Sequence, residues 1–257
     1  MRSDGMIAIV TGASSGIGAA TALALARAGA TVVATARRVD ELERTAVACR
    51  AHAPASFAVS ADLAVIGEGE RVVAETTARL GRVDIVVNNA GVSLHRSALA
   101  TSAAEVEHVM QVNFHSAVRT TMAALPGMVE RRRGSIVNVT SVAGYLPNPR
   151  ESAYGASKAA LSRWSHGLAV DLHGSGVHVG VLSPGPIDTP IWDAEYTGRK
   201  YPPELVADGI VTMIERDVAH MTVPRRFGAV GAMYGLPLIG RLMRRGIVSY
   251  ERRTETA

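Results

Sequence analysis

The fold is decided by one stretch near the start of the chain, Thr11-Gly12-Ala13-Ser14-Ser15-Gly16-Ile17-Gly18. An apolar run, 6–11, precedes this stretch, and an Ala-rich segment with helical spacing follows it. Glycine lets the backbone turn tightly and approach an anion closely, and the N–H groups at a helix start favour a negative charge. We therefore predict a strand, a glycine turn and a helix whose start binds a pyrophosphate group. The alternative is a glycine turn that only tightens helix packing.

Apolar runs and longer helical patterns alternate along the chain. The strand-like runs are 6–11, 31–35, 56–60, 83–88, 135–140 and 177–183, and helical spacing of apolar residues fills 17–28, 41–51, 68–80, 103–128, 153–173 and 203–220. This alternation predicts an α/β fold, a Rossmann-like doubly wound parallel sheet of six or seven strands flanked by helices. The seventh strand stays open, because 221–224 is only a weak candidate for it.

The composition fits one globular domain over residues 1–257. Of the 257 residues, 47% are hydrophobic and 19% are charged, which argues against extensive disorder. The single cysteine, Cys49, has no partner for an internal disulfide and is interpreted as a cytosolic thiol. The N-terminal apolar run is short for a signal peptide, and no run of about 18 apolar residues is present. We therefore expect a cytoplasmic protein.

The net charge of +4 comes largely from arginines near the C-terminal end. A basic chain is compatible with nucleic acid, but zinc-finger spacing and aromatic-rich RNA-binding strands are absent from the sequence. An anionic cofactor or a membrane surface explains a modest positive charge equally well. We expect no nucleic-acid partner and no metal site.

The end of the second predicted strand indicates which dinucleotide the chain binds. Arg37 and Arg38 follow this strand directly, and no acid stands at its end. An acid there would bind a ribose hydroxyl and repel a 2′-phosphate, whereas arginine binds phosphate with paired N–H donors. The pattern favours NADP over NAD, and the alternative is a solvated basic turn. Asp62, after the third strand, is expected either to meet the adenine amino group or to cap its own loop.

A tyrosine and a lysine stand four residues apart, at Tyr154 and Lys158. On a helix, side chains at this spacing project from one face. A tyrosine hydroxyl is a poor base at neutral pH, and a nearby ammonium group lowers its pKa by stabilising the phenolate. The pair therefore predicts a proton donor and acceptor, although this spacing alone occurs by chance in many helices.

Two further polar residues are candidates for the same site. Ser141 lies at the end of the fifth predicted strand, and parallel strands present their carboxyl ends to the ligand. Ser141 is thus expected to hold a substrate oxygen beside the Tyr154 hydroxyl. Asn113 lies within a predicted helix, where an amide usually makes only a local contact. Here we expect it to hold a water that links Lys158 to solvent.

The assembled pattern resembles the short-chain dehydrogenase/reductase family in its form of roughly 250 residues. The resemblance covers about residues 5–220. Each matching motif is modest alone, but their order and spacing are specific. The matches are Thr11-Gly12-x3-Gly16-x-Gly18, Asp62, Asn88-Asn89-Ala90-Gly91, Asn113, Ser141, Tyr154-x3-Lys158 and Pro184-Gly185 with Thr189.

The resemblance implies an oxidoreductase that interconverts a ketone or aldehyde and an alcohol with NADP(H). It implies that Tyr154 is the acid/base, that Lys158 binds the nicotinamide ribose, that Ser141 orients the carbonyl and that Asn113 completes a proton relay. The cofactor-binding residues it implies, beyond the glycine stretch, are Arg37, Arg38, Asp62, Leu63, Asn89, Ala90, Gly91, Tyr154, Lys158, Pro184, Gly185, Ile187 and Thr189. Homodimers or homotetramers are expected on the same ground. The competing hypothesis is a non-catalytic NADP-binding regulatory protein.

The loop 186–202 occupies the place of a substrate lid. Ile191, Trp192 and Tyr196 are expected to contact the substrate together with Ser141 and Tyr154, and they would form an apolar cover. We therefore expect a hydrophobic substrate, such as a steroid, lipid-like or aromatic ketone or alcohol. The alternative is that these aromatic side chains only pin the loop.

The tail 222–257 mixes apolar residues with arginines and is amphipathic. Three interpretations remain open for it. It forms a weak membrane-surface contact, a lid over an apolar substrate, or a subunit or core contact.

Overall fold

A seven-stranded parallel sheet is the centre of the computed structural model, which describes residues 3–191 and 198–228. The strands are β1 (Ile7–Thr11), β2 (Thr31–Ala36), β3 (Phe57–Ser60), β4 (Ile85–Asn88), β5 (Gly134–Val139), β6 (Val177–Pro184) and β7 (His220–Val223). Their order across the sheet is β3-β2-β1-β4-β5-β6-β7, and every neighbouring pair is parallel. The predicted Rossmann-like doubly wound sheet is confirmed.

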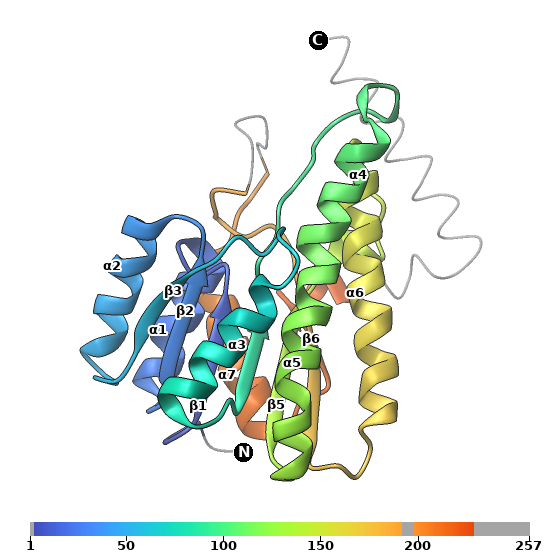
Figure 1. Ribbon diagram of the computed structural model, residues 1–257. Helices are drawn as coiled ribbons and strands as arrows, with labels where there is room; N and C mark the ends of the chain where they lie inside the picture. The colour runs from blue at the N-terminus through green and yellow to red at the C-terminus, as the bar shows by residue number, and fades with distance from the viewer. Residues whose placement is uncertain (1–2, 192–197, 229–257) are drawn as a thin grey trace.

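Helices cover both faces of this sheet (Figure 1). They are α1 (Gly16–Arg27), α2 (Val39–Arg50), α3 (Glu68–Leu80), α4 (Ala103–Met110), α5 (Ser116–Glu130), α6 (Ser152–Asp171) and α7 (Pro203–Arg216). One apolar cluster buries side chains of α1, α2 and α7 against the sheet, and a second buries those of α3, α5 and α6 on the other face. Strands covered on both faces have near-continuous apolar sequences, as those of β1 and β4 do.

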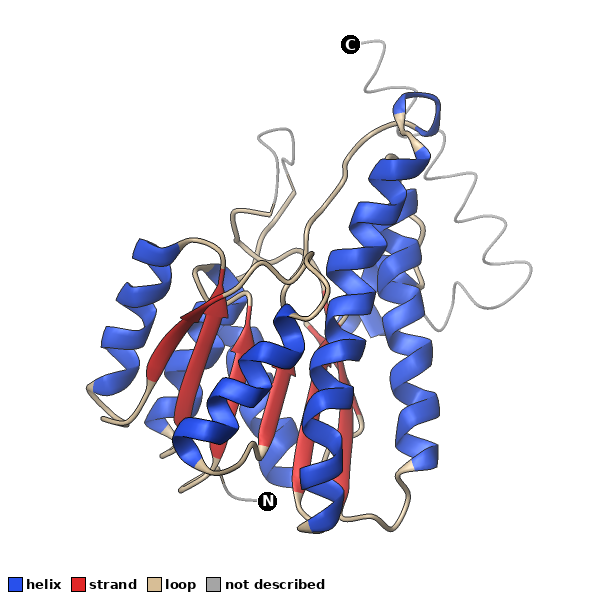
Figure 2. Cartoon of the chain, viewed as in Figure 1, coloured by secondary structure: helices blue, strands red, loops and turns tan. Residues whose placement is uncertain are grey.

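The strand order reverses beside β1, because the chain runs outward to β3 and then returns to β4. At such a reversal the two connections leave the sheet in opposite directions and open a crevice outside the carboxyl ends of the strands. Figure 2 shows the loops gathered at this edge of the sheet. The fold therefore places a ligand crevice above β1 and β4.

The structure resolves the question of the seventh strand. Residues 203–220 do not form one helix as predicted, because α7 ends at Arg216 and Asp217 adopts the left-handed conformation with φ 52°. The chain then turns back, and β7 pairs with β6 from His220 to Val223. The predicted tail therefore begins within a strand. Residues 229–257 of this tail lie outside the described residues.

The predicted helix over 103–128 contains a wider turn. Between α4 and α5, residues Gln111–His115 form a π-helical turn, in which the N–H of Ser116 bonds to the carbonyl of Gln111. Such turns inside α-helices are frequent at functional sites. Asn113 lies in this turn.

A buried chain of amides and hydroxyls joins the sheet to α5 and α6. Asn88 and Asn138 are register partners on β4 and β5, and the Asn88 Nδ2 atom donates to the Asn138 Oδ1 atom over 2.8 Å. Asn88 also donates to Thr121 of α5, over 2.8 Å, and Asn138 donates to Ser165 of α6, over 2.7 Å. This amide ladder fixes both helices against the central strands.

None of the described helices is long and apolar enough to cross a membrane.

Candidate active site

A large cavity opens where the parallel strands end. Its volume is about 1890 Å3, which exceeds the roughly 300–1,000 Å3 typical of small-molecule sites. Nearly all of the described residues predicted to bind cofactor or substrate line it, namely Gly12, Ser14, Ser15, Gly16, Ile17, Arg37, Arg38, Asp62, Leu63, Asn89, Ala90, Gly91, Ser141, Tyr154, Lys158, Pro184, Gly185, Ile187, Thr189 and Ile191. Gly18 and Asn113 lie behind the wall, and Trp192 and Tyr196 lie outside the described residues.

The glycine turn is held in close contact with two neighbouring loops. Gly12 and Gly16 have φ of 68° and 55°, which side chains rarely adopt. A Cβ atom on Gly12 would lie 2.9 Å from the Cα atom of Ala90, and one on Gly16 would lie 2.8 Å from Thr189. A Cβ atom on Gly18 would collide with the Gly12 carbonyl. The glycines therefore tighten packing, and they also keep backbone at the cavity wall.

Thr11 ties the end of β1 to the loop after β4. Its hydroxyl accepts hydrogen bonds from the N–H groups of Asn89 and Ala90, over 2.9 and 3.0 Å. The Asn89 side-chain amide donates in return to the Thr11 carbonyl, over 2.9 Å. These bonds fix the loop 89–91 beside the glycine turn.

Arg38 bends back over the glycine turn. Its Nη2 atom donates to the hydroxyls of Ser14 and Ser15, over 3.0 and 2.7 Å. This brings a guanidinium group and two hydroxyls together at one end of the cavity, where the exposed Arg37 also lies. Such a set of donors is suited to a phosphate group. Asp62 lines the same end and caps its own loop, because its Oδ1 atom accepts from the N–H of Ala64 over 3.1 Å.

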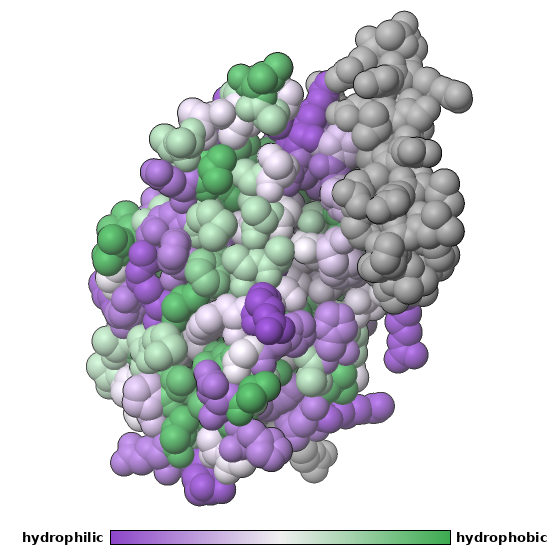
Figure 3. All heavy atoms as spheres, turned by 90° about the vertical axis from the view of Figure 1, so that its right-hand side faces the viewer, coloured by the Kyte–Doolittle hydropathy of each residue, from purple (hydrophilic) through white to green (hydrophobic). Residues whose placement is uncertain are grey.

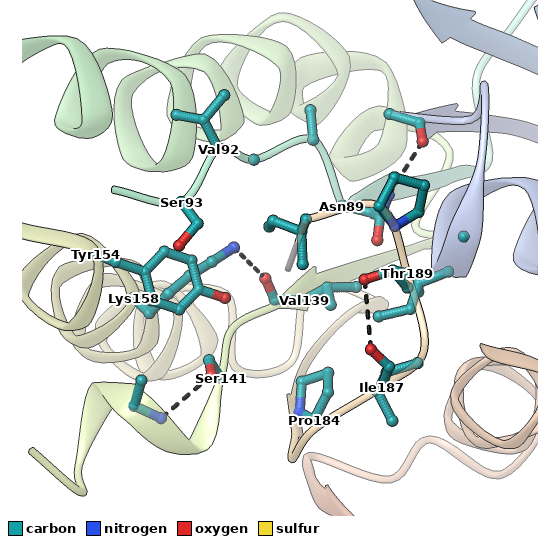
Figure 4. A pocket seen from close by; sticks show the side chains of 18 of the residues that line it. Asn89, Val92, Ser93, Val139, Ser141, Tyr154, Lys158, Pro184, Ile187 and Thr189 are labelled. Carbon is teal, nitrogen blue, oxygen red and sulfur yellow. Dashed lines mark hydrogen bonds between the residues drawn. The ribbon is translucent and has the colours of Figure 1, made fainter. Parts of the chain in front are cut away.

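At the other end of the cavity, Tyr154, Ser141 and Lys158 face the same space (Figure 4). The helix α6 carries Tyr154 and Lys158 on one face, and Ser141 follows β5. The Lys158 Nζ atom lies 5.8 Å from the centre of the Tyr154 ring. Thr189 and Ile187 approach from the opposite side of the cavity (Figure 4). The predicted convergence of these three groups is what the structure shows.

The electrostatics of the pair differ from the sequence expectation. Burial raises the pKa of Tyr154 to about 12, although hydrogen bonding with the Ser141 hydroxyl acts to lower it and the Glu151 charge raises it further. Burial also lowers the pKa of Lys158 to about 8, because the residue is only 3% exposed and its charged form is disfavoured. The protein alone therefore favours a neutral phenol. Burial, and not the predicted lowering by Lys158, is the main determinant of the Tyr154 pKa.

The side-chain amide of Asn113 is hydrogen-bonded to other groups of the protein. Its Oδ1 atom accepts from the N–H of Val92 over 2.8 Å, and its Nδ2 atom donates to the Val92 carbonyl and to the Ser157 hydroxyl, each over 2.9 Å. Asn113 thus fixes the strand-end loop against α6, one residue before Lys158. Its role in a proton relay stays a prediction.

Several cavity residues were not anticipated from the sequence. Ser93 points toward the Tyr154 ring (Figure 4), and Glu151 lines the wall one turn before Tyr154. Phe227, from the segment after β7, packs so closely against Gly185 that a Cβ atom there would lie 2.8 Å from its ring. The spacing of Glu151 to Tyr154 was available as a signal. The contact of Phe227 depends on the path of the chain after β7, which no local pattern specifies.

The base of the predicted lid loop is closed by backbone pairing. Tyr201 donates its N–H to the Pro186 carbonyl over 2.9 Å and accepts from the N–H of Asp188 over 2.7 Å. The guanidinium of Arg226 lies over the rings of both Tyr201 and Phe227, 5.2 and 5.1 Å from their centres. The two ends of the loop therefore meet at the cavity wall.

The profile of the short chain dehydrogenases matches residues 6–200 of the chain. The chain belongs to this family of oxidoreductases. A short chain dehydrogenase of Pseudocercospora fijiensis is 35% identical over 205 residues, which are 77% of this chain and 66% of that protein. The 3-oxoacyl-(acyl-carrier-protein) reductase of Thermotoga maritima is 32% identical over 237 residues, which are 86% of this chain and 95% of that enzyme.

Solved structures of this family superpose closely on the short-chain dehydrogenase described here. The 3-ketoacyl-(acyl-carrier-protein) reductase of Brucella melitensis, crystallised with NADH, matches with a TM-score of 0.80 and 26% identity. The match covers 87% of this chain and 99% of that one. The predicted family and fold are thereby confirmed.

Proposed function

We propose that this short-chain dehydrogenase interconverts a ketone or aldehyde and an alcohol with NADP(H), with Tyr154 as the general acid and base. The observation that carries the proposal is the shared cavity. It joins the glycine turn and Arg38 at one end to Tyr154, Ser141 and Lys158 at the other. A dinucleotide bound at the glycine turn would extend along this cavity, and its nicotinamide end would then meet the phenol.

The residues at the phenol end suit proton transfer to a carbonyl oxygen. The bound nicotinamide supplies or accepts the hydride. Tyr154 donates its hydroxyl proton to the oxygen of the reacting carbon, and the Ser141 hydroxyl holds that oxygen. Lys158, whose Nζ atom donates to the Val139 carbonyl over 2.9 Å, would bind the nicotinamide ribose. A phenol with a pKa of about 12 is protonated at neutral pH and can donate its proton, which favours carbonyl reduction.

The residues at the other end fit NADP. Arg38, Ser14 and Ser15 offer converging donors, and Arg37 adds a second exposed guanidinium beside them. The end of β2 carries no acid that would repel a 2′-phosphate. The choice of NADP rests on these donors, since the Brucella relative was crystallised with NADH.

The substrate part of the cavity has a largely apolar wall. Val92, Val142, Leu146, Ile191 and Phe227 contribute to it. These side chains support the hypothesis of a hydrophobic substrate, such as an aromatic, lipid-like or steroid carbonyl compound.

Replacing the phenol tests the proposal. Tyr154→Phe should reduce NADPH-dependent turnover of a ketone panel by at least roughly a hundredfold, in the range of general acid catalysis, and leave the dissociation constant of NADPH unchanged. The same panel read with NADH tests the cofactor preference. NADPH binding without turnover of any carbonyl by the wild type would instead favour a regulatory protein.

We further propose that the protein is a cytoplasmic homo-oligomer paired through α5 and α6. Met122, Val129 and Val170 are exposed apolar side chains on these helices. On the side of the molecule that carries α6, apolar and polar groups are interspersed (Figure 3). Light scattering of the wild type and of the double variant Met122→Asp, Val170→Asp tests this pairing.

Co-sedimentation with anionic vesicles tests one of the three interpretations of the tail 222–257, a weak contact with a membrane surface.

A further inference from the structure

Two carboxylates line the described part of the cavity, and only one of them lies near the phenol. Asp62 is at the end of β3, beside the glycine turn. Glu151 is the residue that precedes α6, three positions before Tyr154. It is the N-cap of this helix and lines the cavity together with Tyr154. Glu151 therefore faces the place where a substrate bound at Tyr154 would extend.

Glu151 is buried with few partners. The residue is 8% exposed, and its Oε2 atom accepts a hydrogen bond from the Asn148 Nδ2 atom over 2.8 Å. Among residues 3–191 and 198–228, no cation forms an ion pair with it. A carboxylate has acceptor sites for about four hydrogen bonds, so one bond leaves most of its capacity unused.

A structural role accounts for part of this arrangement. A negative charge at a helix start is stabilised by the helix dipole, and Asn148 satisfies one oxygen. That role does not require the side chain to line a cavity beside the reacting phenol. A carboxylate at this position is best explained by a group that it binds.

We propose that Glu151 accepts a hydrogen bond from a hydroxyl or ammonium group that the substrate carries next to its reacting carbon. The substrate is then an otherwise apolar carbonyl compound with one hydrogen-bond donor, and Glu151 determines this specificity. The inference rests on the proposed function and narrows its substrate class. An analogue that lacks the donor should bind less tightly, because it cannot make this hydrogen bond to the carboxylate.

Matched ketones test the proposal on the full chain. α-Hydroxyacetophenone carries the donor, propiophenone replaces the hydroxyl with a methyl group, and α-methoxyacetophenone keeps the oxygen without the donor. α-Aminoacetophenone supplies the ammonium group. We expect the wild type to prefer the hydroxy or the amino ketone to propiophenone and to the ether by roughly tenfold or more in kcat/KM, as for a hydrogen bond to a charged group.

Variants assign this preference to the carboxylate. Glu151→Leu should abolish it while retaining turnover of propiophenone. Glu151→Gln, which keeps an acceptor oxygen but no charge, should retain preference for the hydroxyl and lose preference for the ammonium group. Glu130→Gln, which alters an exposed carboxylate at the far end of α5, is the control and should change nothing. Thermal unfolding of each variant checks that it folds.

Binding provides a readout that does not depend on turnover. Calorimetry with the NADP+-saturated protein, in which ketones cannot react, should show the same preference and its loss in Glu151→Leu. A wild type that binds and reduces propiophenone as well as the donor-bearing ketones would overturn the inference, as would a preference that survives Glu151→Leu. Either result leaves the proposed function intact if Tyr154→Phe remains inactive on propiophenone. If none of these ketones binds, the inference is wrong, while the proposed function is judged on the broader ketone panel read with NADPH.

Discussion

The Lys158 side chain ends against the backbone of Val139, with 2.9 Å between its Nζ atom and the Val139 carbonyl oxygen. The ammonium group is buried there, and no carboxylate among the described residues forms an ion pair with it. Burial therefore disfavours its charged form and lowers its pKa from 10.5 to about 8. At neutral pH this buried ammonium group destabilises the folded protein.

This cost predicts a characteristic dependence of stability on pH. Between about pH 8 and 10.5 the unfolded chain binds the Lys158 proton and the folded chain does not, so the free energy of unfolding rises with pH. The rise from this group is about 3 kcal/mol. Lys158→Met should lack it. Urea denaturation of both proteins at pH 7 and pH 10 measures the change in the free energy of unfolding. An equal change in the two proteins would show that burial does not lower the pKa of Lys158.

The two directions of the reaction should differ in their pH profiles. Tyr154, with a pKa of about 12, is protonated across the neutral range, so ketone reduction should stay level up to about pH 8. Above that pH it should fall, as Lys158 loses its charge. Alcohol oxidation requires the phenolate and should rise from pH 6 to pH 8. Steady-state kcat/KM in both directions tests this, and an oxidation rate that falls over this range would contradict it.

Reversing the charge of Arg38 should reverse the cofactor preference. Arg38→Asp removes the guanidinium held over Ser14 and Ser15 and places a carboxylate near the ribose. The KM for NADPH should rise roughly 10- to 100-fold, the effect of losing a charge-assisted hydrogen bond, while the KM for NADH changes little. Arg44→Asp, on the exposed side of α2, is the matched control. Equal effects of the two substitutions would refute a specific role for Arg38.

Breaking the amide ladder should weaken the whole fold. Asn138→Ala removes the acceptor of Asn88 and the donor to Ser165, both of which are buried. The substitution removes two buried hydrogen bonds, while Asn88 keeps its bond to Thr121 and Ser165 keeps its bond to the Leu161 carbonyl. Losing two such bonds costs about 1–3 kcal/mol in the free energy of unfolding. Thr212→Ala, which deletes an exposed hydroxyl contact with Asp208, should change it by less than about 0.5 kcal/mol. Chemical denaturation of both variants gives the comparison.

The sequence was sufficient to predict the parts of the site that follow from local geometry. Tyr154 and Lys158 share a helix face because they are four residues apart, and Ser141 joins them because parallel strands end at one edge of the sheet. These relationships depend only on helix and strand periodicity and on the topology of the sheet.

Other features depend on packing that periodicity does not encode. The Asn113 amide is taken up by Val92 and Ser157, which meet only when the loop after β4 folds against α6. The pKa of Tyr154 follows its burial more than its spacing from Lys158. The end of α7 at Arg216 required the left-handed turn at Asp217, a conformation that is uncommon for residues other than glycine.

The contact of Arg38 with Ser14 and Ser15 has a consequence for the thermodynamics of coenzyme capture. When a ligand immobilises an arginine side chain that is free in solvent, the loss of side-chain entropy costs about 0.5–1.5 kcal/mol of binding free energy. Here two serine hydroxyls already restrain the guanidinium beside the glycine turn before any phosphate arrives. This entropy loss has already occurred on folding, so a phosphate group that binds here would meet an ordered guanidinium.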